Sequence, residues 1–325
     1  MHAVRALTVS ALSDDLSGVA LRDRPDPDRR PGQLLVRVRA ASLNYPDLLM
    51  TRGAYQLKPP VPFTLGMEVA GEVLACDPDS GFAPGERVAA GTRLGGFADL
   101  VAVDARTARR IPAAIDDARA AALGAAYLTA YVALVRLGRL EAGEWVLVHG
   151  ATGGVGLAAL DLARALGART IATSRSPDKL ALVEREYRPD LALPAPGFRE
   201  GVKQATGGGA DLVFDPVGGG VFDESTRCTA FGGRLLVVGF TSGRIASVPA
   251  NIPLIKGFSV VGVRAGEYGR RFPERGAEDV DAIWSLAAAG RIRPRVHATY
   301  PLADWRAAFD AMARAEHVGK LVMIP

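Results

Sequence analysis

The chain has 325 residues, of which 49% are hydrophobic and 23% charged, with two cysteines and a formal net charge of +4. This composition excludes a disordered chain, a collagen-like repeat and a disulfide scaffold, and the length suits two domains. The positive charge is small and dispersed, so we expect no nucleic-acid partner. No run of about 18 residues is apolar without charge or repeated glycine, so we expect no membrane partner.

Two further features predict a cytoplasmic protein. Cys76 and Cys228 cannot form a four-thiolate zinc site, and so few cysteines favour a reducing compartment. The N-terminal segment lacks a basic flank, a long apolar core and a cleavage site, and we interpret it as a first strand rather than a signal peptide.

The residues up to about 125 predict a mainly β domain. Short strand-like runs are separated by proline and glycine clusters, and the clearest of them cover residues 34–43, 68–76 and 86–91.

From about residue 126 the pattern changes to strands that alternate with helices. A helical stretch precedes a strand at 145–150, and helices and strands then alternate as far as a strand at 259–263. This order predicts a parallel sheet with helices on both faces. We interpret residues 192–201 as a proline-rich loop. Two helices around 276–290 and 303–315 and a last strand at 319–325 are expected to follow.

The most informative segment is a glycine turn between a strand and a helix. Ala151, Gly153 and Gly156 match the dinucleotide fingerprint, with alanine at the first glycine position. Small residues let the backbone approach the pyrophosphate, and the helix N-terminus offers free N–H groups. The alternative, a turn that merely joins strand to helix, is disfavoured by the flanking elements. The predicted cofactor-binding residues of this turn are Gly153, Gly154, Val155 and Gly156.

The end of the second strand favours NADPH over NADH. An NAD-binding site usually carries Asp or Glu there, whereas this chain has Ser174, followed by Arg175 and then Lys179. A hydroxyl and two cations suit a 2′-phosphate that a carboxylate would repel. In the alternative interpretation, the two cations are ordinary surface charges.

Several segments together resemble the medium-chain dehydrogenase/reductase superfamily, and within it the zinc-free quinone oxidoreductase group. The segments are residues 41–55, 62–73, 148–156, 208–219, 232–240 and 319–325. The resemblance implies an α/β fold class: a Rossmann doubly wound parallel sheet plus a GroES-like β-barrel catalytic domain. By the same resemblance, residues 1–125 and 266–325 form the catalytic domain, residues 126–265 form the NADP-binding domain, and substrate meets nicotinamide between them.

The resemblance also implies chemistry without a metal. Zinc-dependent members of the superfamily have cysteine where this chain has Asn44, histidine at Met67 and a third ligand near Ala125. We therefore expect hydride delivery from NADPH to a quinone or an α,β-unsaturated carbonyl. One alternative is an enoyl-thioester (enoyl-CoA type) reductase, with Arg264, Arg270 and Arg271 as contributors. Another is a non-enzymatic NADPH-binding structural or redox-sensing protein.

The family's cleft motif provides the candidate catalytic residues. Tyr55 is the preferred oxyanion donor or proton source and Asn44 an orienting amide that also contacts the cofactor, while Asp47 is expected to hold local backbone or an arginine. Alternatively, Tyr45 and Tyr55 are half-buried barrel residues and Asn44 stabilises a turn. Further cofactor contacts implied by the resemblance are Thr129, Phe240, Thr241 and Val263.

Two further expectations and one departure from the family pattern concern His149, positions 49 and 194, and the segment 257–266. His149 precedes the glycine turn within a strand and is expected to serve packing. Many members of the group carry a tyrosine where this chain has Leu49, and a tyrosine or histidine near Pro194. The apolar segment 257–266 is expected to be the last strand of the parallel sheet and to form a homodimer through that edge.

Overall fold

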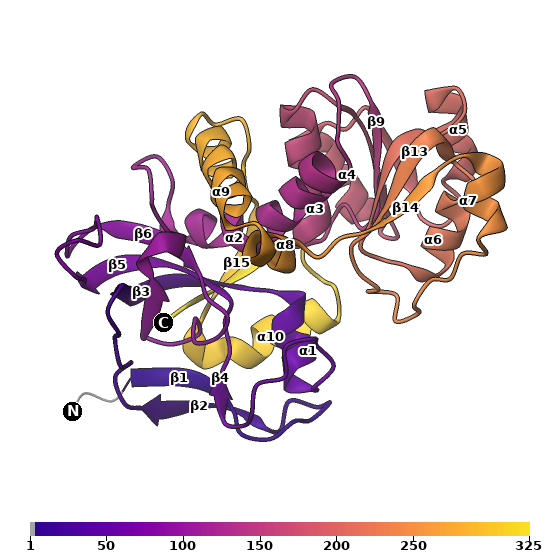
Figure 1. Ribbon diagram of the computed structural model, residues 1–325. Coiled ribbons are helices and arrows are strands. Elements are labelled where there is room, and N and C mark those ends of the chain that lie inside the picture. The colour runs from indigo at the N-terminus through magenta and orange to yellow at the C-terminus, as the bar shows by residue number, and fades with distance from the viewer. Residues whose placement is uncertain (1–3) are drawn as a thin grey trace. The chain divides into compact units, whose positions relative to one another are not determined.

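The computed structural model describes residues 4–325, which form two compact units (Figure 1). One unit comprises the residues up to Ala125 together with Pro294–Pro325, and the other is Ala126–Arg293. The first boundary coincides with the expected one, whereas residues 266–293 belong to the second unit and not to the first. Part of their attachment is electrostatic: Arg136 donates to Glu278 at 2.8 Å and to the buried Asp279 at 2.7 Å. Ile283 and Ala287 of the same segment are buried.

The first unit is mainly β, as expected. Its larger sheet has the order β15-β16-β3-β5-β6-β8, with β7 paired to β3, and its smaller sheet has the order β2-β1-β4. The strands are β1 (Val4–Val9), β2 (Val19–Arg24), β3 (Gln33–Leu43), β4 (Phe63–Thr64), β5 (Glu68–Ala75), β6 (Arg87–Gly91), β7 (Leu100–Asp104), β8 (Ala108–Arg110), β15 (Val296–Pro301) and β16 (Lys320–Ile324). The helices are α1 (Tyr45–Thr51), η1 (Ala105–Thr107), η3 (Leu302–Asp304), α10 (Trp305–Ala313) and the first part of α2 (Asp117–Tyr131).

The second unit is a parallel α/β domain with helices on both faces of its sheet (Figure 1). Its strands are β9 (Trp145–Val148), β10 (Arg169–Ser174), β11 (Leu191–Pro194), β12 (Ala210–Asp215), β13 (Thr229–Val237) and β14 (Ser259–Gly262). Its helices, besides the end of α2, are η2 (Val132–Leu137), α3 (Gly154–Ala165), α4 (Pro177–Tyr187), α5 (Arg199–Thr206), α6 (Gly219–Ser225), α7 (Asn251–Lys256), α8 (Ala265–Arg271) and α9 (Pro273–Ala288).

The strand order of this sheet is β11-β10-β9-β12-β13-β14, and each neighbouring pair is parallel. Numbered within the unit, this is the dinucleotide-binding order 3-2-1-4-5-6, whose direction of winding reverses between β9 and β12. The interpretation of residues 192–201 as a loop was wrong at both ends, because Leu191–Pro194 pairs with β10 as an edge strand and Arg199–Thr206 forms α5. Proline is tolerated there because an edge strand needs no second ladder of hydrogen bonds.

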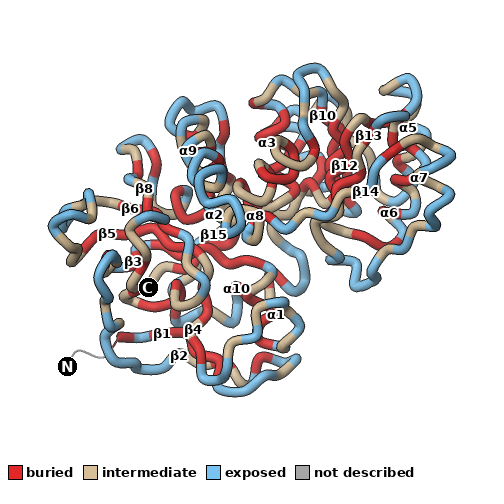
Figure 2. Tube along the Cα trace, in the orientation of Figure 1, coloured by how far each residue is buried: buried red, intermediate tan, exposed pale blue. Residues whose placement is uncertain are grey.

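Burial explains why β9 and α3 form and pack together (Figure 2). Val146, Leu147 and Val148 are fully buried, as the continuous apolar run of a central parallel strand requires. In α3 the residues from Gly156 to Ala163 are all buried, and most are alanine or leucine, which favour helix. Small side chains bring this helix close to the sheet, and its N-terminus therefore lies directly after β9.

The chain passes from one unit to the other twice, and residues next to both crossings form hydrogen bonds with Asp161 of α3. Close to the first, the Tyr127 hydroxyl donates to Asp161 Oδ2 at 2.7 Å. At the second, the Arg293 N–H donates to the same oxygen at 2.6 Å, and the Tyr187 hydroxyl donates to the Arg293 carbonyl at 2.9 Å. Asp161 is thus a buried acceptor shared by two segments that are far apart in the sequence.

The α2 and η2 segment, Asp117–Leu137, is long and apolar enough to cross a membrane by length and composition alone. Its most apolar window is 56% buried inside the protein. Such burial is typical of a core helix in a globular domain.

Asp47 is a buried carboxyl in the first turn of α1. It accepts the N–H of Asn44 at 2.9 Å and the N–H of Gly66 at 3.2 Å. Asp47 therefore holds local backbone, which is one of the two roles expected from the sequence. Burial nevertheless raises the pKa of Asp47 to about 7, because desolvation outweighs the two N–H donors.

His149 is fully buried in the second unit, consistent with a packing role. Its Nδ1 lies 2.8 Å from the Thr173 hydroxyl and its Nε2 2.7 Å from that of Ser225, while the ring packs on Phe198. The Ser225 hydroxyl donates its proton to the Val221 carbonyl, so it must accept from Nε2–H. Burial lowers the pKa of His149 to about 3, and the imidazole stays neutral.

We expect His149 and Asp47 to have opposite effects on stability between about pH 6.5 and pH 4. There the unfolded chain protonates His149 and the folded protein does not, so stability falls with pH by up to about 1.4 kcal/mol per unit. Asp47 is protonated in the folded protein first, so it adds stability as pH falls below about 7. His149→Gln should therefore gain stability relative to the native protein on acidification, as measured by urea unfolding at several pH values.

The control is His297→Gln, because His297 is exposed. A stability difference between native protein and His149→Gln that stays constant from pH 7 to pH 4 would contradict the assignment of a neutral, buried imidazole.

Candidate functional site

The glycine turn lies at the carboxyl end of β9, where the winding of the sheet reverses. Gly150 has a positive φ of +57°, and Gly153 is the N-cap residue of α3. A Cβ on Gly156 would overlap the Gly150 carbonyl oxygen, whereas one on Gly153 would lie 3.4 Å from it. The third glycine is therefore obligatory for helix and turn to meet, and the free N–H groups of the first turn of α3 form an anion-binding end.

The three residues predicted to select the cofactor lie at the end of the neighbouring strand. Ser174 ends β10 and is buried, and its hydroxyl accepts the N–H of Ser176 at 3.2 Å. Arg175 is exposed and has no side-chain partner within residues 4–325, and Lys179 lies in the first turn of α4. The hydroxyl and the two cations thus lie within the span from the last residue of β10 to the first turn of α4.

Three other predicted cofactor contacts follow β13 and β14. Phe240 and Thr241 come after β13, and Thr241 is held by hydrogen bonds from its N–H and hydroxyl to the Pro216 carbonyl, both 3.1 Å. Val263 directly follows β14, and its N–H donates to the Val237 carbonyl. Because all strands are parallel, these segments share the carboxyl edge of the sheet with the glycine turn. Thr129 lies on α2, and its contact with the cofactor stays a prediction.

Sequence reasoning missed Asp215, which shapes the same edge. It ends β12, and its Oδ1 accepts the N–H groups of Val217 at 2.8 Å and Gly218 at 2.9 Å. Burial raises the pKa of this carboxyl. The signal was available: an acidic residue ends an otherwise apolar strand and is followed by proline and glycine.

The first unit contains a buried polar cluster around Asn44. The Asn44 amide donates to Glu68 Oε1 at 2.9 Å and to the Ser42 carbonyl at 3.2 Å, and its Oδ1 accepts from Lys320 Nζ at 2.6 Å. Lys320 also donates to Glu68 Oε1 at 3.1 Å, and Glu68 Oε2 accepts the Ala125 N–H at 2.6 Å. Glu68 and Lys320 are 2% and 6% exposed, so this ion pair is dry.

Sequence reasoning did not single out Glu68 or Lys320. Each is a charged residue at the start of an apolar strand, β5 or β16, and this was the only local signal. Their pairing depends on β16 and β5 lying on either side of β3, which the sequence spacing does not reveal.

The cluster does not suit a zinc ion. The positions that carry ligands in zinc-dependent members of the superfamily are Asn44, Met67 and Ala125, whose neutral amide, thioether and methyl groups do not supply the thiolate, imidazole or carboxylate ligands of a zinc site. That amide oxygen already accepts from the Lys320 ammonium group, whose positive charge would repel a second cation. Residues 4–325 contain no group of three or more His, Cys, Asp or Glu residues arranged to hold a metal.

The two candidate tyrosines differ in their surroundings. Tyr55 is half-buried and packs against the apolar core of the first unit, whereas Tyr45 opens α1 and is 39% exposed. Leu49, at the position where many relatives have tyrosine, belongs to the same helix. The catalytic role of Tyr55 stays a prediction.

The arginines considered for a thioester phosphate are partly neutralised. Arg270 and Arg271 both pair with Glu267, at 2.9 Å and 3.0 Å. A phosphate would have to compete with this carboxylate for both guanidinium groups.

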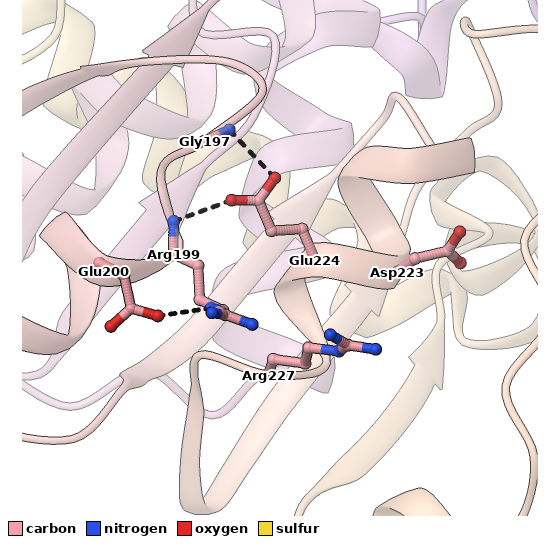
Figure 3. Close-up of a pocket in the computed structure, with 6 residues that line it drawn as sticks. All are labelled: Gly197, Arg199, Glu200, Asp223, Glu224 and Arg227. Atoms are coloured by element: carbon pink, nitrogen blue, oxygen red, sulfur yellow. Dashed lines mark hydrogen bonds and ion pairs between the residues drawn. The ribbon is translucent and has the colours of Figure 1, made fainter.

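A separate pocket of about 420 Å³ lies between the start of α5 and the end of α6 (Figure 3). Glu224 accepts the backbone N–H groups of Gly197 and Arg199, and Arg199 pairs with Glu200. None of the predicted site residues lines this pocket. Its charges serve the local structure, and we assign it no ligand.

Comparison with protein families agrees with this architecture. Residues 30–113 match the alcohol dehydrogenase GroES-like domain, and residues 154–283 match a domain described as zinc-binding dehydrogenase. Quinone oxidoreductase-like protein 2 of Mus musculus is 35% identical over 297 residues, which are 90% of this chain and 85% of that protein.

Two further similarities bear on function. The quinone oxidoreductase from Thermus thermophilus has been solved by crystallography, and its complex with NADPH is also known. The match has a TM-score of 0.88 and a sequence identity of 32%, and it covers 99% of this chain and 100% of that one. A mycocerosic acid synthase-like polyketide synthase of Mycobacterium tuberculosis is 33% identical over 93% of this chain, which spans 14% of that protein.

We expect Gly156→Ala to weaken dinucleotide binding by at least about tenfold and to lower stability by about 1–3 kcal/mol, because helix and turn must separate. Fluorescence titration with the cofactor and thermal unfolding measure the two effects. Gly220→Ala is the matched control, a helical glycine whose added Cβ would meet no atom within 4 Å. Native affinity in Gly156→Ala would contradict the fingerprint assignment.

Proposed function

Since the chain belongs to the quinone oxidoreductase group of the medium-chain dehydrogenase/reductase superfamily, we propose that it is an NADPH-dependent reductase of quinones or α,β-unsaturated carbonyl compounds that works without a metal. The observation that carries the proposal is the glycine turn at the point of reversal in a 3-2-1-4-5-6 sheet.

The residues present fit a phosphorylated dinucleotide. Gly153, the second glycine of the fingerprint, carries no side chain that would block the close backbone approach that the pyrophosphate needs, and the N-terminus of α3 favours its charge. Ser174, Arg175 and Lys179 would hold the 2′-phosphate, and Phe240, Thr241 and Val263 would border the nicotinamide half. The complex of the Thermus thermophilus relative with NADPH supports this choice over NADH.

Bound NADPH supplies a hydride at C4 of its nicotinamide ring. The protein then has to align the acceptor, exclude water and stabilise the oxygen that gains charge. Because the Asn44, Glu68 and Lys320 cluster does not suit zinc, we propose an acceptor that is already electron-poor. Tyr55 is the proposed donor to its oxygen.

A second candidate is an enoyl-thioester reductase. The similarity to a segment of a polyketide synthase, an enzyme of another reaction class than the quinone reductases, keeps it open. The pairing of Arg270 and Arg271 with Glu267 argues against a strong phosphate subsite there, so we rank this function below the first. A cytoplasmic location, without nucleic-acid or membrane partners, stays a prediction.

To test the acceptor, we would follow nicotinamide absorbance with NADPH or NADH and a panel of a small quinone, an enal, an enone and an enoyl-CoA. We expect NADPH to be used with kcat/KM about tenfold or more above NADH, and the quinone or enone to outperform the thioester. Faster turnover of the enoyl-CoA would favour the second candidate. Tight NADPH binding without oxidation by any acceptor would indicate the non-enzymatic alternative.

Arg175→Ala tests the cofactor assignment within the same assay. We expect its KM for NADPH to rise about tenfold with little change for NADH, because only the 2′-phosphate contact is lost. Arg185→Ala, an exposed arginine of α4 paired with Glu186, is the matched control.

We also propose that two copies of the chain associate through β14. This strand pairs only with β13, so its other edge offers unpaired N–H and C=O groups within residues 4–325. Large apolar side chains are exposed on the elements next to it: Phe231 on β13, Leu254 and Ile255 on α7, and Val260 on β14. A second copy could cover them by antiparallel pairing of the two β14 edges about a two-fold axis.

Val260→Lys should shift the protein from dimer to monomer, because a charge would be buried at the paired edge. Light scattering after size exclusion measures the mass. Leu12→Lys, at an exposed leucine of the first unit, is the control. A native protein that is monomeric at micromolar concentration would refute the proposal.

A further inference from the structure

The loop that follows β13 forms hydrogen bonds with the turn that follows β12. Thr241 donates its N–H and its hydroxyl to the Pro216 carbonyl, both at 3.1 Å, and the Ser242 N–H donates to the Val217 carbonyl at 3.0 Å. The ladder between the two strands already ends at Asp215. The turn therefore extends the contact between the two segments beyond the end of the sheet and fixes the course of the loop.

The N–H groups and the carbonyls of this turn have different partners. The N–H groups of Val217 and Gly218 donate to Asp215 Oδ1, at 2.8 Å and 2.9 Å, whereas the carbonyls of Pro216 and Val217 accept from the loop. Asp215 is 1% exposed, so loss of its carboxylate would leave two N–H groups without their acceptor in a dry interior. One buried oxygen thus holds the turn, and the turn holds the loop.

Two glycines of the turn leave room for the loop. Gly218 has a φ of +70° and a ψ of −157°, a backbone conformation that is open essentially to glycine alone. A Cβ there would lie 2.9 Å from Phe240 Cδ1, and a Cβ on Gly219, whose φ is +58°, would lie 2.7 Å from Ser242 Oγ. The Phe240 ring therefore packs against the Gly218 backbone, while 39% of the residue stays exposed.

This turn and loop lie away from the residues expected to bind the 2′-phosphate. Ser174 ends β10 and Arg175 follows it, and the order β10-β9-β12-β13 places two strands between β10 and β13. At about 4.8 Å per strand, the ends of β10 and β13 are roughly 14 Å apart. A displacement of the loop after β13 should therefore leave the 2′-phosphate contacts intact.

We propose that Asp215 is a positioning residue for the nicotinamide half of the cofactor: it holds the turn after β12, and this turn sets the positions of Phe240 and Thr241. The inference rests on the proposed NADPH-dependent function and adds to it a residue that acts through the backbone rather than by contact with the cofactor. Asp215 should contribute to the binding of the nicotinamide half and not to that of the adenosine half.

Two substitutions of Asp215 separate positioning from a general structural role. Alanine removes the acceptor of two N–H groups, and we expect the Kd of NADPH to rise about tenfold or more as the loop loses its support. Asparagine retains an oxygen that can accept both N–H groups, so Asp215→Asn should bind NADPH within about threefold of native. Adenosine 2′,5′-bisphosphate lacks the nicotinamide half and should bind all three proteins within about twofold of one another.

Calorimetric titration measures both dissociation constants, and thermal unfolding shows whether each variant is folded. Parallel loss of affinity for NADPH and for adenosine 2′,5′-bisphosphate in folded Asp215→Ala would indicate general damage to the site and overturn the inference. Native NADPH affinity in that variant, or absence of recovery in folded Asp215→Asn, would overturn it as well.

Gly219→Ala tests the turn without changing Asp215, and it decides alone if Asp215→Ala does not fold. Its Cβ would displace the Ser242 side chain and with it the loop, so we expect the Kd of NADPH to rise about fivefold and that of adenosine 2′,5′-bisphosphate to stay within about twofold of native. Gly220→Ala is the matched control, because a Cβ there meets no atom within 4 Å. Native NADPH affinity in folded Gly219→Ala refutes the inference, whereas failure of the native protein to bind NADPH refutes the proposed function.

Discussion

The contact between Gly156 and the carbonyl of Gly150 is the constraint from which the nucleotide-binding unit is built. It brings the N-terminus of α3 to the end of β9, at the one place in a 3-2-1-4-5-6 sheet where the loops on either side diverge. Any side chain at this position would separate helix from strand. The buried alanines and leucines of α3 extend the same close approach along the helix.

The buried ionisable groups of this protein stabilise local structure through hydrogen bonds with specific donors and acceptors. Asp47, Asp161 and Asp215 each accept from two backbone or side-chain donors, and desolvation raises the pKa of all three. His149 is kept neutral by burial and takes part in a single pattern of hydrogen bonds with Thr173 and Ser225. Such groups favour one local arrangement because each alternative leaves a polar atom unpaired in a dry interior.

The fold could be predicted where local signals are strong. Apolar strands, the glycine turn and the change of pattern near residue 126 each depend on neighbours in the sequence. The elements that were assigned wrongly depend instead on residues that are distant in the sequence. Leu191–Pro194 becomes a strand only because β10 lies beside it. Residues 266–293 join the second unit through contacts with distant residues, among them the ion pairs of Arg136 and the hydrogen bond from Arg293 to Asp161. Glu68 and Lys320 are 252 positions apart, so no local pattern indicates that they meet.

The discontinuity of the first unit has a consequence for biosynthesis. β16 is an interior strand of the larger sheet, between β15 and β3, and it carries Lys320. A nascent chain therefore cannot complete that sheet, or close the Asn44 cluster, before Lys320–Ile324 have left the ribosomal exit tunnel. The second unit is contiguous in the sequence and can fold earlier. During translation the first unit therefore keeps an unpaired edge at β3 while the second unit is already folded.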